Sequence, residues 1–253
     1  MLRFFRTLRH RLLTENRASK YLLYAMGEIL LVVIGILIAL QVDDWREERK
    51  LDEERIAILT NLNTDLINDS RNYYTNIRRL EERQEIADQV LELLEQTPSK
   101  IDSADTARKL LILGYIEDYS PSFATYNEIQ GSGKLGLLNS NELKIDLANF
   151  RSAVDYFRII ENNWSEDLKD YERIISGYFG GNIPLQNYDF TIHQSPQNKN
   201  LRFDLKAMSL NEDLISRIRH IAYFTKIQID IKKSVLLPMC EGTITKIEDE
   251  LKN

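Results

Sequence analysis

The chain has 253 residues and a formal net charge of −6, with 28% charged and 43% hydrophobic residues. Its 10 Gly and 5 Pro are too few for a β-sandwich, a barrel or a collagen-like fibre, and its apolar fraction is too high for a disordered chain. The single cysteine, Cys240, excludes an intrachain disulfide framework and a multi-cysteine zinc or iron–sulfur site, and the 3 His lack the spacing of metal ligands. We therefore expect a helix-rich protein with no metal site and no cofactor.

Charge is distributed unevenly along the chain. Residues 1–20 carry a net charge of +5, residues 21–42 carry −1 and residues 43–253 carry −10. A basic tip, an apolar band and an acidic body are typical of a membrane-anchored protein, whereas a nucleic-acid-binding protein needs a basic body. We therefore predict a basic cytoplasmic tip (1–20), a transmembrane helix (21–42) and a periplasmic helical domain (43–253), with the lipid bilayer and not nucleic acid as a partner.

The basic tip has a helical pattern of its own. Leu2, Phe5, Leu8 and Leu12 recur every three or four residues, with arginines between them. This pattern predicts a cationic amphipathic helix on an anionic cytoplasmic leaflet, although a topology signal with no further role would look the same. The basic residues expected at the membrane surface are Arg3, Arg6, Arg9, Arg11, Arg17 and Lys20.

Residues 21–42 are long and apolar enough to cross a bilayer. As a helix these 22 residues measure about 33 Å, against a hydrocarbon core of ~30 Å. Thirteen are Leu, Ile or Val and favour insertion by roughly 4–8 kcal/mol, more than the ~3 kcal/mol that an ionised Glu28 costs. A cleaved signal peptide is the competing interpretation, but the stretch exceeds an h-region of ~7–15 residues and no A-x-A site follows it. The basic residues before this signal anchor place the N-terminus in the cytoplasm, and the expected interface anchors are Tyr21, Tyr24 and Trp45.

One face of the span combines small residues with an acid. Ala25, Glu28, Val32, Gly35 and Ala39 follow a 3-4-3-4 spacing, and Gly35-x-x-x-Ala39 allows another helix to approach closely. We predict a helix–helix contact in the membrane, with a second copy of the chain or with another membrane protein, in which Glu28 is a polar tether or a proton-responsive group. The alternative is a protonated Glu28 that hydrogen-bonds along its own helix and has no further role.

After the span, a three/four spacing predicts one long amphipathic helix, continuous with the span and ended by Thr97-Pro98. Its apolar positions are Leu59, Leu62, Leu66, Tyr73, Ile77, Leu80, Ala87, Leu91 and Leu94. The pattern is broken at Asp69–Ser70 and at Gln84, which favours one helix of a bundle over a strict coiled coil.

Four more helical segments follow, over residues 103–119, 120–131, 139–178 and from 209 towards the C-terminus. Ser120 is the predicted N-cap of the second of these, with Pro121 in its first turn, and residues 139–142 and 209–212 have the form of capping boxes. Pro238 should kink or split the last helix. Residues 182–200 are irregular, with a short strand possible at Tyr188–Ile192. The predicted fold is all-α, a transmembrane helix that continues into an up-down bundle of four or five helices.

The sequence does not predict an enzyme. Residues 131–134 suggest a P-loop, but Glu128 and Leu135 occupy positions that require Gly and Ser/Thr, so a glycine-containing turn is expected. Neither G-x-S-x-G nor H-E-x-x-H occurs. Cys240 follows an apolar run and fits a small buried residue better than a nucleophile.

The residues around the span resemble those of one family. The stretch FFRTLRHRLLTENRASKYLLYAMGEILLVVIGILIALQVDDWREERK is similar to the single-pass membrane proteins of Bacteroidota that form a domain family of unknown function, with an Asp43–Asp44 pair where two Asn are common. The positions that fall on the family pattern are Tyr21, Tyr24, Gly27, Glu28, Gly35, Gln41, Trp45, Glu47, Glu48 and Arg49. The segment SFATYNEIQGSGKLGLLNSNEL resembles the family's second block. The resemblance implies a bacterial inner-membrane protein with a helical periplasmic domain, and it implies no activity.

We therefore expect a membrane-anchored interaction or structural protein, because the exterior is helix-rich and lacks catalytic motifs. One alternative is an accessory subunit of an ion-driven motor or transporter that uses Glu28, by analogy of layout only. Another is a periplasmic sensor that acts through a separate partner, because the ~20-residue cytoplasmic part is too small for a signalling domain. In that case segment 182–200 would respond to the ligand.

Overall fold

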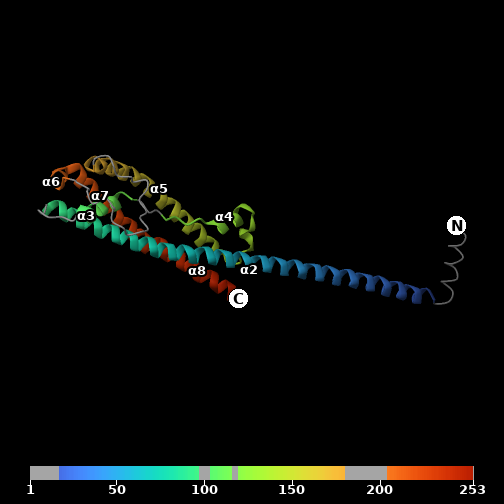
Figure 1. Ribbon diagram of the computed structural model, residues 1–253. Helices are drawn as coiled ribbons and strands as arrows, with labels where there is room; N and C mark the ends of the chain where they lie inside the picture. The colour runs from blue at the N-terminus through green and yellow to red at the C-terminus, as the bar shows by residue number, and fades with distance from the viewer. Residues whose placement is uncertain (1–16, 97–102, 116–118, 180–203, 253) are drawn as a thin grey trace. The chain divides into compact units, whose positions relative to one another are not determined.

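A computed structural model describes residues 17–96, 103–115, 119–179 and 204–252, and all regular structure in these residues is helical (Figure 1). The predicted all-α class is therefore confirmed. The chain divides into two compact units, residues 1–57 and 58–253. The predicted tip helix, the possible strand at 188–192 and the segment 182–200 lie outside the described residues.

Helix α2 (Arg17–Gln96) is a single helix of 80 residues, so the predicted continuity from the apolar span to Thr97-Pro98 is confirmed. Its N-terminal part holds the one stretch among the described residues that is long and apolar enough to cross a membrane. None of that stretch is buried, which does not fit a core helix of a soluble domain, although a signal sequence near an N-terminus has the same length and composition.

The unit of residues 58–253, here called the helical domain, combines the C-terminal half of α2 with shorter helices (Figure 1). These are α3 (Ser103–Gly114), α4 (Ala124–Gly131), the 3₁₀ helix η1 (Lys134–Leu137), α5 (Asn141–Tyr178), α6 (Leu205–Ser209), α7 (Glu212–Ile231), the π-helix η3 (Lys232–Leu236) and α8 (Leu237–Lys252). Helix α5 packs against α3, α7 and α8. Two apolar clusters form the core, because every long helix presents a three/four stripe inward.

The first cluster joins α2, α4, α5 and α8, with Leu59, Phe150 and Cys240 at its centre. The second joins the end of α2 to α3, α5, α6 and α7, with Val90 and Leu214 fully buried. Neither cluster includes residues of the apolar span.

Two predicted helix bounds are wrong. Helix α3 ends at Gly114, five residues before the predicted end. Helix α4 begins at Ala124, after Phe123 in the left-handed region (φ 52°), and has no side-chain cap. Ser120 does not cap it, because the Ser120 hydroxyl accepts a hydrogen bond from Arg158 of α5 and Pro121 is buried.

The predicted capping boxes identify the right helices but the wrong cap residues. Helix α5 is capped by Ser140, whose hydroxyl accepts from the Leu143 amide at 3.1 Å, and not by Asn139. Helix α7 is capped by Asn211, which accepts from the Leu214 amide at 3.0 Å. Ser209 instead ends the extra helix α6 and donates to the Lys206 carbonyl.

Pro238 does split the last helix, as predicted. The π-helix η3 ends two residues before it. Because Pro238 has no N–H to donate to the Ser234 carbonyl and its ring clashes with that carbonyl in a regular α-helix, one wider turn accommodates it.

Candidate functional site

The predicted contact residues in the apolar span lie on one helix and are exposed. They are Ala25, Glu28, Val32, Gly35 and Ala39. A Cβ atom added at Gly35 would meet no heavy atom within 4 Å, so no described residue packs on this position. Of the predicted interface anchors, Tyr21 and Trp45 are exposed and Tyr24 lies in the same helix. Arg17 and Lys20 are in its first turns, whereas Arg3, Arg6, Arg9 and Arg11 lie outside the described residues.

Inside the helical domain, α2 places three polar residues on its buried stripe at heptad spacing. These residues, Asp69, Asn76 and Arg83, are here called the polar seam. Each is at least nine-tenths buried and each contacts a different part of the chain. A buried polar group is costly without partners, so the contacts of each member show what the seam does.

Asp69 accepts a hydrogen bond from the Tyr119 hydroxyl, and the Tyr119 ring meets Tyr73 edge-on at 5.3 Å. Burial raises the pKa of Asp69; the Tyr119 hydrogen bond opposes this shift and the nearby Asp65 carboxylate adds to it. Cys240 packs beside this group and donates to the Leu66 carbonyl at 3.3 Å. Cys240 is buried, as predicted, and burial raises the pKa of its thiol to about 12.

Asn76 accepts from the Lys232 ammonium at 2.8 Å, at the start of the π-helix. The same ammonium pairs with the Glu161 carboxylate at 3.0 Å and lies 5.5 Å from the centre of the Phe157 ring. The side chains of Lys232 and Glu161 are only 1% and 8% exposed. Gln228 also donates to Glu161, at 3.1 Å. This buried ion pair therefore links α2, α5 and η3.

Arg83 meets the C-terminal end of α3. Its guanidinium donates to the Leu113 carbonyl at 2.8 Å, and the Tyr171 hydroxyl donates to the Leu110 carbonyl at 2.7 Å. The Leu113 carbonyl is among the last carbonyls of α3, which lack intrahelical donors, so the Arg83 contact caps this helix end from outside, and the Tyr171 contact lies almost one turn earlier. Burial lowers the Arg83 pKa to about 10, and the side chain still carries its charge at neutral pH. The Arg83 Nε is buried and has no hydrogen-bond partner among the described residues.

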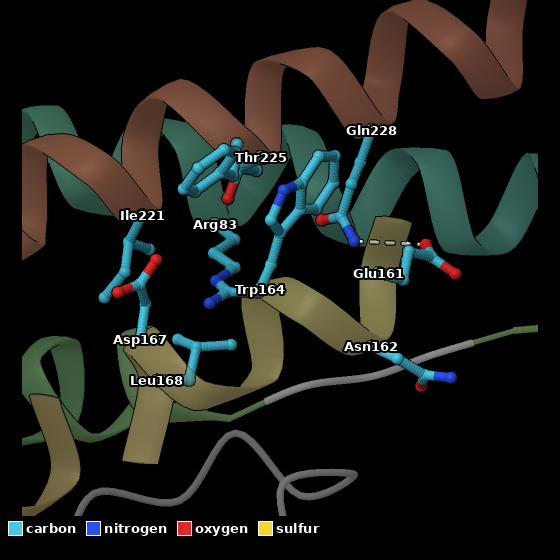
Figure 2. A pocket seen from close by; sticks show the side chains of 10 residues that line it. Arg83, Glu161, Asn162, Trp164, Asp167, Leu168, Ile221, Thr225 and Gln228 are labelled. Atoms are coloured by element: carbon cyan, nitrogen blue, oxygen red, sulfur yellow. Dashed lines mark hydrogen bonds between the residues drawn. The ribbon is translucent and has the colours of Figure 1, made fainter. Parts of the chain in front are cut away.

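A cavity of about 310 Å³ opens beside Arg83, between α2, α5 and α7 (Figure 2). It is lined by Arg83, Glu161, Asn162, Trp164, Asp167, Leu168, Ile221, Phe224, Thr225 and Gln228. The Trp164 and Phe224 rings are stacked, with centroids 4.6 Å apart and planes at 25°. Figure 2 shows the guanidinium of Arg83 among the side chains of Trp164, Asp167 and Leu168.

The sequence pattern marked the Asp69 break in the apolar stripe but missed Asn76, Arg83 and the cavity. Arg83 follows Leu80 by three residues and precedes Ala87 by four, so the sequence places this cation on the inward apolar stripe. That position was the signal from which its burial could have been predicted. At residues 131–134 the structure shows the expected turn, with Gly133 at φ 73°. The part of the chain that the structure describes includes no group of three or more His, Cys, Asp or Glu that would hold a metal ion.

Comparison with known proteins identifies a family. The family model described as "Family of unknown function (DUF6090)" matches residues 28–183. That range runs from the middle of the apolar span to just past α5 and includes the polar seam and the α5 side of the cavity. No curated protein and no solved structure matches the chain. Since the family model covers more than half of the sequence, the chain belongs to this family of unknown function.

Proposed function

We propose that this protein is a single-pass bacterial inner-membrane protein whose helical domain is held in the periplasm for interaction with other proteins. The carrying observation is the exposed apolar stretch of α2, which continues without a break into the helical domain. Exposed apolar surface of this extent marks a membrane or protein contact. The resemblance to single-pass proteins of Bacteroidota supports the same assignment.

The charges around the stretch support an orientation with the N-terminus in the cytoplasm. Six basic residues and one acidic residue precede residue 21, whereas Asp43, Asp44, Glu47 and Glu48 follow residue 42. Basic flanks remain in the cytoplasm, so residues 43–253 are on the periplasmic side. The length of the apolar stretch favours an anchor that is retained over a signal peptide that is removed.

The cysteine content of the chain allows a direct test of this topology. The native thiol, Cys240, is buried, so the unchanged chain serves as an unlabelled control. A variant with Cys240→Ala and Tyr156→Cys presents one thiol at a position that is 69% exposed. We expect a membrane-impermeant maleimide to label it in intact spheroplasts, and the chain to stay in carbonate-washed membranes. Labelling only after lysis would refute the orientation, and extraction by carbonate would refute the anchor.

The face formed by Ala25, Glu28, Val32, Gly35 and Ala39 is proposed as the contact with a second copy or with a membrane partner. Small residues permit close helix approach, and Glu28 in an apolar stretch needs a polar partner or a proton. Gly35→Leu should disrupt the complex seen in a gentle-detergent purification. Gly27→Leu is the matched control, because Gly27 lies off this face on the same helix. Equal effects, or no effect of either change, would refute the contact.

Glu28→Gln separates recognition from ion coupling. Loss of a co-purifying polytopic membrane protein in this variant would favour an accessory subunit that uses the carboxylate. A homo-oligomer unchanged by the substitution would show that Glu28 has no part in assembly and would leave the helical domain as the interacting part.

A further inference from the structure

Arg83 is a buried cation whose charge no described carboxylate neutralises. The residue is 8% exposed, and no ion pair joins it to an acid within the described parts of the chain. Among the described residues its one acceptor is the neutral Leu113 carbonyl, and its Nε–H has none there. Guanidinium groups match carboxylates through two parallel N–H donors, so a guanidinium that lines a cavity and has no carboxylate partner among the described residues is suited to an anion.

The cavity beside Arg83 has the size and walls of a small-molecule site. Its volume of about 310 Å³ lies at the lower end of the range of about 300–1,000 Å³ for ligand pockets. The stacked rings of Trp164 and Phe224 and the side chains of Leu168 and Ile221 supply apolar surface. An apolar wall with one charged group is the usual composition of a site for a small organic anion.

The other charges around the cavity limit the charge of a ligand. Glu161 is paired with Lys232 at 3.0 Å, and Asp167 lies 3.8 Å from Arg217. The cations of Lys232 and Arg217 are thus engaged with protein carboxylates. Arg83 has no such partner among the described residues. Because Arg83 supplies one uncompensated positive charge to the cavity and the lining also holds two carboxylates, a phosphate dianion is disfavoured and a monoanion is favoured.

We propose that this cavity binds a small organic monocarboxylate, with the carboxylate on the Arg83 guanidinium and an apolar body against Trp164 and Phe224. The proposal concerns the helical domain alone and does not depend on the membrane topology proposed above.

Trp164 provides the readout. The chain has two tryptophans, Trp45 and Trp164, so Trp45→Phe leaves emission only from the cavity wall. The full-length Trp45→Phe protein in detergent is titrated with sodium benzoate, with benzamide as the neutral analogue of the same shape and sodium chloride at equal ionic strength. We expect a saturable change in Trp164 emission with benzoate and a much weaker one with benzamide. No saturable response to benzoate, or equal affinity for both compounds, would overturn the proposal.

Two substitutions test the role of charge, each in the Trp45→Phe background. Arg83→Lys keeps the positive charge but removes the planar set of N–H donors that matches a carboxylate, and should weaken benzoate binding at least about tenfold. Asp167→Asn removes a carboxylate from the lining at a side chain that is 41% exposed, and should strengthen binding. Far-UV circular dichroism checks the fold of both variants. Unchanged benzoate affinity in a folded Arg83→Lys protein would overturn the proposal. If the Arg83→Lys protein does not fold, unchanged or weaker benzoate binding by the Asp167→Asn protein would overturn it.

Discussion

Replacement of Lys232 by methionine should destabilise the helical domain strongly. The Lys232 side chain is 1% exposed and its ammonium lies 3.0 Å from the Glu161 carboxylate, itself 8% exposed. Methionine fills a similar volume but leaves the Glu161 charge buried without its ammonium, and Gln228 remains as a neutral donor. Removal of one partner of a buried ion pair costs about 3–5 kcal/mol. Domains are stable by only about 5–15 kcal/mol, so a large share of the free energy of unfolding would be lost.

Urea unfolding of the full-length protein in detergent, followed by circular dichroism and tryptophan emission, measures this loss. Lys233→Met is the matched control, because the neighbouring lysine is 48% exposed and pairs with Glu81 at the surface, where a pair is worth about 1 kcal/mol or less. The double variant Lys232→Met, Glu161→Gln removes both charges and should recover about 0.5–3 kcal/mol over additivity. A Lys232→Met cost no larger than that of Lys233→Met would refute the argument that this pair is buried.

Three further predictions concern Cys240, Asp69 and Ser140. The Cys240 thiol, buried and with its pKa raised to about 12, should react with a disulfide reagent at pH 8 only after denaturation; rapid reaction in the folded protein would contradict its burial. Because the Asp69 pKa is raised above 3.8, the folded domain retains this proton to higher pH than the unfolded chain, and the free energy of unfolding falls as pH rises from about 3.8 through the folded pKa. Asp69→Asn removes this dependence, so the urea midpoint of the variant should rise relative to that of the unchanged protein as pH rises across that interval. Midpoints of the two proteins that change with pH in parallel would contradict the prediction. Ser140→Ala should cost about 1 kcal/mol and Ser140→Asn almost nothing, read from the same midpoints, because Ser140 caps α5 and the Glu250 carboxylate beside it disfavours an acidic replacement.

The long helices were predictable because their signals are local and repeated. Helix α2 keeps a three/four apolar spacing over many turns and stops at Gln96, just before Pro98. Helix α5 ends at Tyr178, as its sequence pattern indicates. The cap residues were less predictable, because Ser140 and its neighbour Asn139 are both good N-caps and only the backbone geometry decides between them.

The start of α4 and the buried polar contacts were not predictable from local pattern. Ser120-Pro121 is a good helix start by sequence, but Ser120 is engaged by Arg158 from α5, 38 residues away in the chain. Lys232 meets Asn76 across 156 residues, so neither position alone shows that both are buried. A polar residue on an apolar stripe is either buried with a hydrogen-bond partner or an exposed break in the stripe. Only the structure, which shows whether a partner lies opposite, distinguishes the two.

The polar seam gives α2 three fixed points along its length. Apolar stripes pack in several registers at similar cost, whereas a buried polar residue is satisfied only in the register that brings its partner. Asp69 fixes the segment that carries Tyr119, Asn76 fixes the π-helix through Lys232, and Arg83 fixes the end of α3. In the first two contacts an oxygen of the seam residue accepts a hydrogen bond from its partner, and both roles are explained by the fold alone. Arg83 differs, because its charge is uncompensated among the described residues and its side chain lines a cavity. A purely structural role would be filled by the Leu113 contact alone, so the uncompensated charge next to an open space is best explained by a bound anion.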